Sequence, residues 1–284
     1  MHRLLAFGGV LTLAVGVAPA ELIYGVTLQN TLVSWDSATP GTFLSGAAIS
    51  GLSQNEVVRG IDFRPATGEL MLLGSFSRVY TVSTASGVAT PVSAGPFAPA
   101  LNGAQFGFDF NPTVDRIRVV SDTEQNLRLN PSTGALAATD TNLAYAGGDP
   151  GFGVDPDVVH AAYTNNFSGA ASTTLYVMDA GHDVLAIQNP PNNGTLNTVG
   201  ALGINISEYG GFDISGATGN AYAALQSTSE FISRFYTVNL GTGAVSQVGE
   251  IGAGELITAM TVVPAPGALG LAGAALLLAQ RRRR

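Results

Sequence analysis

One sequence unit recurs along the chain and constrains the fold more than any other feature. It opens with a Gly-x-Asp motif, seen in Arg59-Gly-Ile-Asp-Phe, Phe106-Gly-Phe-Asp-Phe and Gly210-Gly-Phe-Asp-Ile. Asp62 and Asp109 are 47 residues apart, and Asp213 follows after 104 more, about two such intervals. Each copy continues into further short apolar runs. Four-stranded units at this spacing are typical of β-propeller blades.

The first complete copy predicts four antiparallel strands. Gly60–Phe63 leads into the turn Pro65-Ala-Thr-Gly68, whose last position suits the positive φ that glycine adopts easily. The runs Leu70–Leu73, Arg78–Val82 and Val88–Val92 follow, joined by hairpin-length connections. Two similar units cover residues 108–138 and 212–248, and a degenerate unit covers residues 160–199.

The two ends of the repeat region complement one another. Ile257–Val263 resembles a first strand with no blade after it, whereas Leu22–Leu28, Thr31–Trp35 and Phe43–Ile49 resemble three later strands with no first strand. Joined, they form one blade that closes the ring and removes open sheet edges. We therefore predict an all-β propeller of five four-stranded blades over residues 21–262. Six blades remain the alternative, because residues 143–172 are irregular.

Composition excludes several kinds of chemistry. The chain has no Cys, and all 12 basic residues are Arg, so thiol, disulfide and lysine-dependent mechanisms are absent. Without Arg3 and Arg281–Arg284, seven Arg face 20 acidic residues, a net charge of −13. Such a body repels nucleic acid, so we expect no nucleic-acid partner. Solubility alone also explains the acidic excess.

The first 20 residues have the pattern of a secretory signal peptide. Arg3 precedes the apolar run Leu4–Val17, and Ala18-Pro-Ala20 supplies the small residues that a signal peptidase recognises. Cleavage is expected between Ala20 and Glu21. An uncleaved anchor is the alternative, although the run is short for a bilayer.

Residues 263–284 form a tripartite tail. Pro264-Ala-Pro266 precedes the apolar stretch Ala268–Ala279, which ends at the cluster Arg281–Arg284. This layout resembles the PEP-CTERM sorting tail, with Ala265 where that motif has Glu. The resemblance implies an exosortase partner, transient anchoring of the exported precursor in the inner membrane, and delivery to the cell surface or release, alongside exopolysaccharide. A plain C-terminal anchor is the alternative.

The repeat region also resembles a bacterial domain of unknown function found in secreted proteins with such tails. The residues that carry the likeness are Phe106-Gly-Phe-Asp-Phe-Asn-Pro-Thr-Val-Asp-Arg-Ile-Arg-Val-Val-Ser121, with support from Asn126–Pro131 and Arg59–Phe63. The likeness covers about residues 23–262. It implies the fold and no particular reaction.

Three groups of residues are candidates for binding. Asp62, Asp109 and Asp213 would form a ring of carboxylates in a propeller channel, where their oxygens suit Ca²⁺; a structural role, accepting backbone N–H bonds, is favoured. Arg116 and Arg118 share one face of a strand. They would bind an anionic sugar, although an ion pair between blades with Asp115 or Asp122 is favoured.

The third group lies in the polar loop of residues 147–157. Its carboxylates Asp149, Asp155 and Asp157 would approach one cation, although Pro150 and Pro156 restrict the loop and a solvated turn is favoured.

No nucleophile elbow or HExxH motif occurs in the chain, so we predict no catalytic residue and no cofactor other than Ca²⁺. The favoured function is a non-enzymatic surface protein that binds exopolysaccharide or another surface protein. A Ca²⁺-dependent hydrolase or lyase at the channel mouth and a purely structural surface protein are the alternatives.

Overall fold

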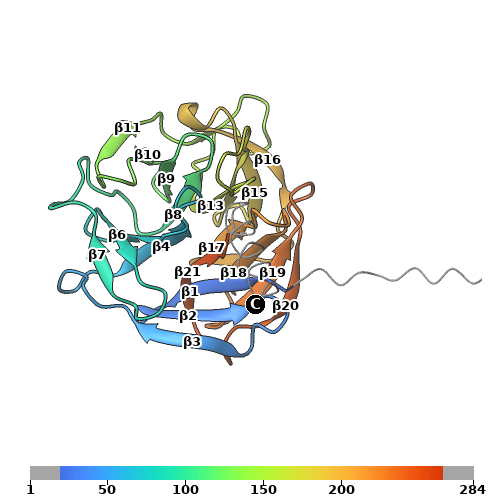
Figure 1. Cartoon of the computed structure of the whole chain (residues 1–284). Helices are drawn as coiled ribbons and strands as arrows, with labels where there is room; N and C mark the ends of the chain where they lie inside the picture. Colours follow the sequence, from blue (N-terminus) through green and yellow to red (C-terminus); the bar gives the residue numbers. More distant parts are fainter. Residues whose placement is uncertain (1–19, 265–284) are drawn as a thin grey trace, which may run out of the picture.

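Five antiparallel sheets surround a common axis in the computed structural model, which describes residues 20–264 (Figure 1). The only helical segment of this part is the 3₁₀ turn Pro191–Asn193. The prediction of an all-β propeller with five blades is confirmed.

Each blade begins with the strand nearest the axis, and four blades follow one another along the chain. Blade 1 contains β4 (Val58–Phe63), β5 (Leu70–Gly74), β6 (Arg78–Val82) and β7 (Ala89–Pro91). Blade 2 contains β8 (Phe106–Asn111), β9 (Arg116–Ser121), β10 (Asn126–Leu129) and β11 (Leu136–Thr139). Blade 3 contains β13 (Val158–Tyr163), β14 (Leu175–Asp179), β15 (Val184–Gln188) and β16 (Thr195–Ala201). Blade 4 contains β17 (Ile206–Ile214), β18 (Ala221–Ser227), β19 (Ser233–Val238) and β20 (Val245–Glu250).

Blade 5 joins the two ends of the described chain. Its inner strand β21 (Ile257–Val262) pairs antiparallel with β1 (Leu22–Thr27), and β2 (Thr31–Asp36) and β3 (Phe43–Ala48) complete the sheet. In this register Ile23 lies opposite Val262. The closing blade is therefore built as the sequence predicts. Because β1 and β21 pair with each other, neither terminal strand is left with an open edge at the junction.

The irregular region before blade 3 does not form a sixth blade. Within residues 143–172 the only strand besides β13 of blade 3 is β12 (Ala144–Tyr145), which pairs in parallel with β16 and makes blade 3 five-stranded. The six-blade alternative is thus wrong, because the remaining residues of this region form turns and loops rather than a second sheet.

Glycine in the repeated motif allows neighbouring inner strands to pack closely. A Cβ atom at Gly60 would lie 2.4 Å from Cβ of Phe108, and one at Gly211 would lie 2.4 Å from the backbone nitrogen of Met260. Gly107 faces Ala161 in the same way. The motif therefore recurs because each inner strand contacts the next blade at this point.

The predicted sorting segments lie almost entirely outside the described residues, including Pro266 and the apolar stretch. Ala20 is exposed at the start of the described chain and Pro264 is its last residue. Glu21 contacts blade 4, where its carboxylate accepts hydrogen bonds from Ser215, Thr218 and Tyr222. Over residues 20–264 no helix has the length and hydrophobicity needed to cross a bilayer.

Candidate functional site

The three aspartates of the repeated motif converge on the propeller axis. Asp62, Asp109 and Asp213 come from β4, β8 and β17, and one carboxylate oxygen of each lies within 4.8 Å of the others. All three side chains are buried, with 1% of each residue exposed. We call these residues the axial cluster.

Each aspartate of the axial cluster accepts a backbone hydrogen bond from the next blade. Asp62 accepts from the N–H of Phe110 at 2.9 Å, and Asp109 accepts from the N–H of Tyr163 at 3.1 Å. Asp213 accepts from the N–H of Val262 at 2.6 Å. One backbone N–H on the axis-facing edge of each of three inner strands thus donates to a carboxylate, which ties blade to blade around the axis.

Two of the five equivalent positions have no aspartate. Ala162 occupies the position in blade 3, and Thr261 occupies it in blade 5. The Thr261 hydroxyl lies 2.9 Å from Asp62 and 3.0 Å from Asp213, so it links their carboxylates. Sequence reasoning did not single out Thr261. The signal is the alignment of Ala259-Met-Thr-Val262 with the Gly-x-Asp motif.

Burial governs the charge of the axial cluster. Burial, reinforced by the charge of Asp213, raises the pKa of Asp62 well above its usual value, and burial reinforced by the other two aspartates does the same to Asp109. Burial also raises the pKa of Asp213 to about 7. Three ionised carboxylates at this separation would repel one another strongly, so protons or a cation must neutralise the cluster. Ca²⁺ would be held there by the three carboxylates and Thr261.

The channel beside the axial cluster is narrow. Its cavity has a volume of about 20 Å³ and is lined by inner-strand residues that include Gly60, Gly107, His160 and Gly211. His160 occupies the position that glycine has in three other blades. Burial lowers the pKa of His160 to about 4, and its Nε2 has no hydrogen-bond partner among the described residues. A cavity of this size has room for about one water molecule.

The loop carboxylates do not form a similar group. Asp149 accepts hydrogen bonds from the N–H of Thr198 at 2.6 Å and from its hydroxyl at 2.8 Å, which fastens the loop to β16. Asp155 is exposed, and Asp157 is half-buried. Burial and the charge of Glu208 raise the pKa of Asp157 to about 6. In the described part of the chain, the axial cluster is the one group of three carboxylates that lie close enough to share a metal ion.

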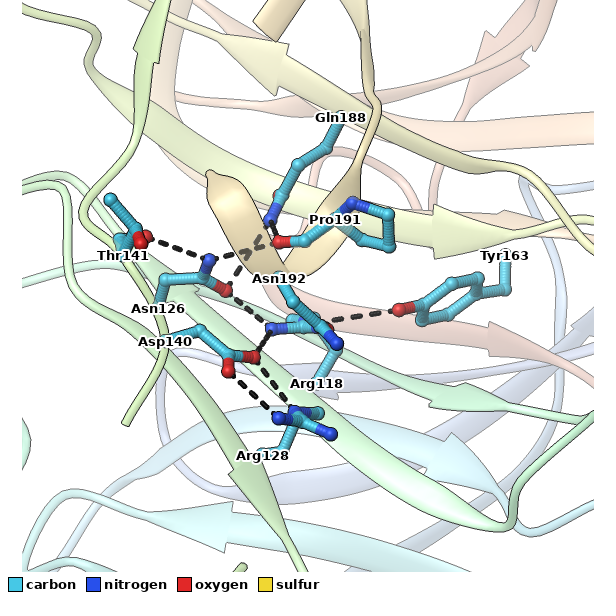
Figure 2. Close-up of polar contacts among 9 residues, drawn as sticks. All are labelled: Arg118, Asn126, Arg128, Asp140, Thr141, Tyr163, Gln188, Pro191 and Asn192. Atoms are coloured by element: carbon cyan, nitrogen blue, oxygen red, sulfur yellow. Dashed lines mark hydrogen bonds and ion pairs between the residues drawn. The ribbon is translucent and has the colours of Figure 1, made fainter. Parts of the chain in front are cut away.

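Arg118 forms the centre of a second polar cluster, between blades 2 and 3 (Figure 2). Its Nη1 donates to Asp140 and to Asn126, each at 2.6 Å, and its Nη2 donates to Asn192 at 2.7 Å. Its Nε lies 3.4 Å from the hydroxyl of Tyr163. Arg118 is 2% exposed, so these contacts hold its guanidinium in one position.

Two further arginines lie beside it. Arg128, which is opposite Arg118 in the β9–β10 register, donates to both carboxylate oxygens of Asp140 at 2.8 and 2.9 Å. Arg116 donates from Nη1 to the backbone oxygen of Asp115 at 2.8 Å. Sequence reasoning identified Arg116 and Arg118 but missed Arg128, although Asn126-Leu-Arg-Leu129 places it on the next strand.

The predicted carboxylate partners of these arginines are wrong. Arg118 pairs with Asp140, which follows β11 of the same blade, and not with Asp115 or Asp122. Asp115 pairs instead with Arg64 of blade 1 at 2.5 Å. Asp122 accepts backbone hydrogen bonds from residues 104 and 105. The loops between strands determine these pairings, and strand alternation alone does not reveal them.

A cavity of about 160 Å³ lies over the three arginines. We call it the arginine pocket, and its lining residues are Asn111, Val114, Arg116, Arg118, Arg128, Tyr163, Pro191 and Asn192.

The comparison with protein families decides the classification. The domain of unknown function DUF4394 matches residues 31–261. The chain belongs to this family. The match covers blades 1 to 4 and most of blade 5, without β1, and the family description assigns no activity to a DUF4394 domain. No curated protein matches the sequence.

Three solved structures are similar to this DUF4394 domain at low identity. A dihydro-heme d1 dehydrogenase, NirN, is 11% identical with a TM-score of 0.40, over 84% of this chain and 45% of that one. A Myxococcus xanthus glutaminyl cyclase is 12% identical with a TM-score of 0.47, over 75% of this chain and 84% of that one. A Bacteroides thetaiotaomicron protein of unknown function is 14% identical with a TM-score of 0.48, over 86% of this chain and 62% of that one. The chain thus spans under half the length of the NirN chain.

The DUF4394 domain therefore presents two different sites. The axial cluster is buried, acidic and tied into the contacts between blades. The arginine pocket has rim residues that reach solvent, since Val114 and Asn192 are exposed and the Arg128 side chain is 32% exposed. A ligand larger than a water molecule has access only to the second of these two sites.

Proposed function

We propose that this DUF4394 protein is a non-enzymatic binding module that is exported, delivered to the cell surface or released, and there binds exopolysaccharide. The narrow axis favours binding over catalysis and carries this proposal, because the carboxylates that would act in a channel enzyme are 1% exposed beside a cavity of about 20 Å³. The predicted signal peptide and sorting tail support export and delivery to the cell surface. An exosortase is the expected processing partner.

The narrow axis argues against the hydrolase or lyase alternative. A general acid or base must come within hydrogen-bond reach of the group it protonates or deprotonates. The carboxylates of the axial cluster instead accept hydrogen bonds from the neighbouring blades, and the cavity above them has no room for a sugar ring. If the three converging carboxylates bind Ca²⁺, the ion has a structural role and not a catalytic one.

Co-sedimentation of the purified protein with insoluble polysaccharides tests the proposal. We expect the protein to pellet with matrix polysaccharide from the producing bacterium and with an acidic polymer such as calcium alginate gel. DNA immobilised on beads serves as the control and should retain none, since the core carries −13. Reducing ends released from the polymer in the presence of Ca²⁺ would favour the enzyme, and failure to pellet with any polysaccharide would favour the structural alternative.

A further inference from the structure

The arginine pocket concentrates the positive charge of an acidic domain. The core has seven arginines against 20 acidic residues, yet Arg116, Arg118 and Arg128 all line this one cavity. Asp140 is the only carboxylate that pairs with them among the described residues. Three guanidinium groups against one carboxylate leave the pocket positive, and a partly enclosed site amplifies that potential.

Hydrogen bonds to the buried Arg118 hold the base of the arginine pocket rigid. Arg118 is fixed by Asp140 and Asn126 of its own blade and by Asn192 of blade 3, and Asp140 also braces Arg128 through both oxygens (Figure 2). A guanidinium held in place before binding loses little freedom when a ligand arrives. The cluster therefore resembles the floor of a binding site as well as a contact between blades.

The groups that remain for a ligand are mainly donors. The Arg116 side chain uses Nη1 for backbone oxygens and makes no other hydrogen bond to the described residues. The Asn192 oxygen accepts from Arg118, so the amide nitrogen of Asn192 is left to donate. Tyr163 accepts from Arg118 and retains its own hydroxyl proton. A ligand that only accepts hydrogen bonds and carries negative charge complements this arrangement.

We propose that the arginine pocket binds the carboxylate of an acidic sugar, a uronic acid residue of a polysaccharide. The assignment deepens the proposed function and rests on it for the polymeric ligand. The planar carboxylate matches the fork geometry of arginine. A cavity of about 160 Å³ is below the usual 300–1,000 Å³ of small-molecule sites, so it takes one charged sugar while the chain continues over the rim.

Titration with free sugars tests the pocket directly. Sodium glucuronate is added to the full-length protein and followed by NMR or calorimetry, with glucose, sulfate and phosphate in parallel. We expect glucuronate to bind in the millimolar range, about tenfold more tightly than glucose. Arg116→Gln should weaken glucuronate binding about tenfold, the effect of losing roughly 1.4 kcal/mol. The matched control Arg78→Gln, half-buried on β6 outside the pocket, should bind like the wild type.

Several results would overturn the pocket assignment. These are unchanged glucuronate binding in Arg116→Gln, equal binding of glucose, and tighter binding of sulfate or phosphate than of glucuronate. If Arg116→Gln proves unfolded by circular dichroism, Arg128→Gln replaces it, because Arg128 is the more exposed partner of Asp140. Polymer binding that survives in a pocket variant leaves the proposed function intact and contradicts the pocket. Glucuronate binding that needs Arg116, without any polymer binding, supports the pocket and contradicts the proposed function.

Discussion

The free energy of unfolding will fall as the pH rises from about 6.5 to 8. Burial gives Asp213 a folded-state pKa of about 7 and raises the pKa of Asp62 and Asp109 well above the unfolded value of about 3.9. The folded state therefore retains protons that the unfolded state has lost. A proton held only by the folded state lowers stability by about 1.4 kcal/mol for each unit that the pH rises. Asp213 contributes to this slope until the pH passes its folded-state pKa of about 7, and Asp62 and Asp109 contribute while they remain protonated.

The window starts near 6.5 because His160 acts in the opposite direction below it. Burial lowers the folded-state pKa of His160 to about 4, against about 6.5 in the unfolded chain, so this histidine makes stability rise with pH between those values. Above pH 6.5 His160 is neutral in both states, and the axial cluster dominates the slope.

Urea denaturation at several pH values measures this slope. Asp62→Asn should make the slope shallower, because one of the three titrating carboxylates becomes an amide that cannot ionise, whereas Asp155→Asn, at an exposed loop position, should leave the slope unchanged. A wild-type curve that is flat between pH 6.5 and 8 would contradict the prediction. Repeating the melts in CaCl₂ tests the ion: a rise in Tm at pH 8 that Asp62→Asn abolishes would place Ca²⁺ in the axial cluster.

Arg118→Ala will lower the free energy of unfolding by about 3 kcal/mol or more. Breaking a buried ion pair from one side typically costs about 3–5 kcal/mol, because the remaining charge and polar groups stay buried without their partner. Here Asp140 keeps Arg128, so the low end applies, while Asn192 loses its donor and Asn126 keeps only Gln188 at 3.3 Å. Urea denaturation at pH 7 gives the difference directly.

Two companion variants control this measurement. Arg118→Lys should recover little stability, because a single ammonium cannot reproduce the spread of bonds to Asp140, Asn126 and Asn192. Arg116→Gln should stay within about 0.5 kcal/mol of the wild type, as expected for a position that bonds only backbone oxygens. An Arg118→Ala protein as stable as the wild type would show that the buried cluster does not hold blades 2 and 3 together.

Strand positions were predictable because several independent sequence signals indicate the same residues. In blade 1 the apolar runs, the Pro65-Ala-Thr-Gly68 turn and the repeat spacing all indicate the same four strands, and β6 has the bounds predicted for it. Closure by β21 and β1 followed from counting strands at the two ends. Such arguments depend on local pattern, which a single sequence contains in full.

The side-chain networks were less accessible from sequence. That Asp62, Asp109 and Asp213 meet depends on how closely the inner strands approach the axis, and Thr261 joins them only because blade 5 repeats the register of the others. The pairing of Arg118 with Asp140 depends on the course of the chain after β11. The repeat spacing places the three aspartates in a ring, but it encodes neither their separation nor the pairing of Arg118 with Asp140, because both depend on tertiary packing.

A crystal structure of the protein soaked with a glucuronate-containing oligosaccharide would test most directly whether this propeller binds acidic sugar away from its axis. The predicted result is density for one uronate in the arginine pocket, with its carboxylate within hydrogen-bond distance of Arg116 or Arg128, and no sugar in the axial channel. Sugar density at the channel mouth beside His160, or an empty arginine pocket at saturating ligand, would contradict it.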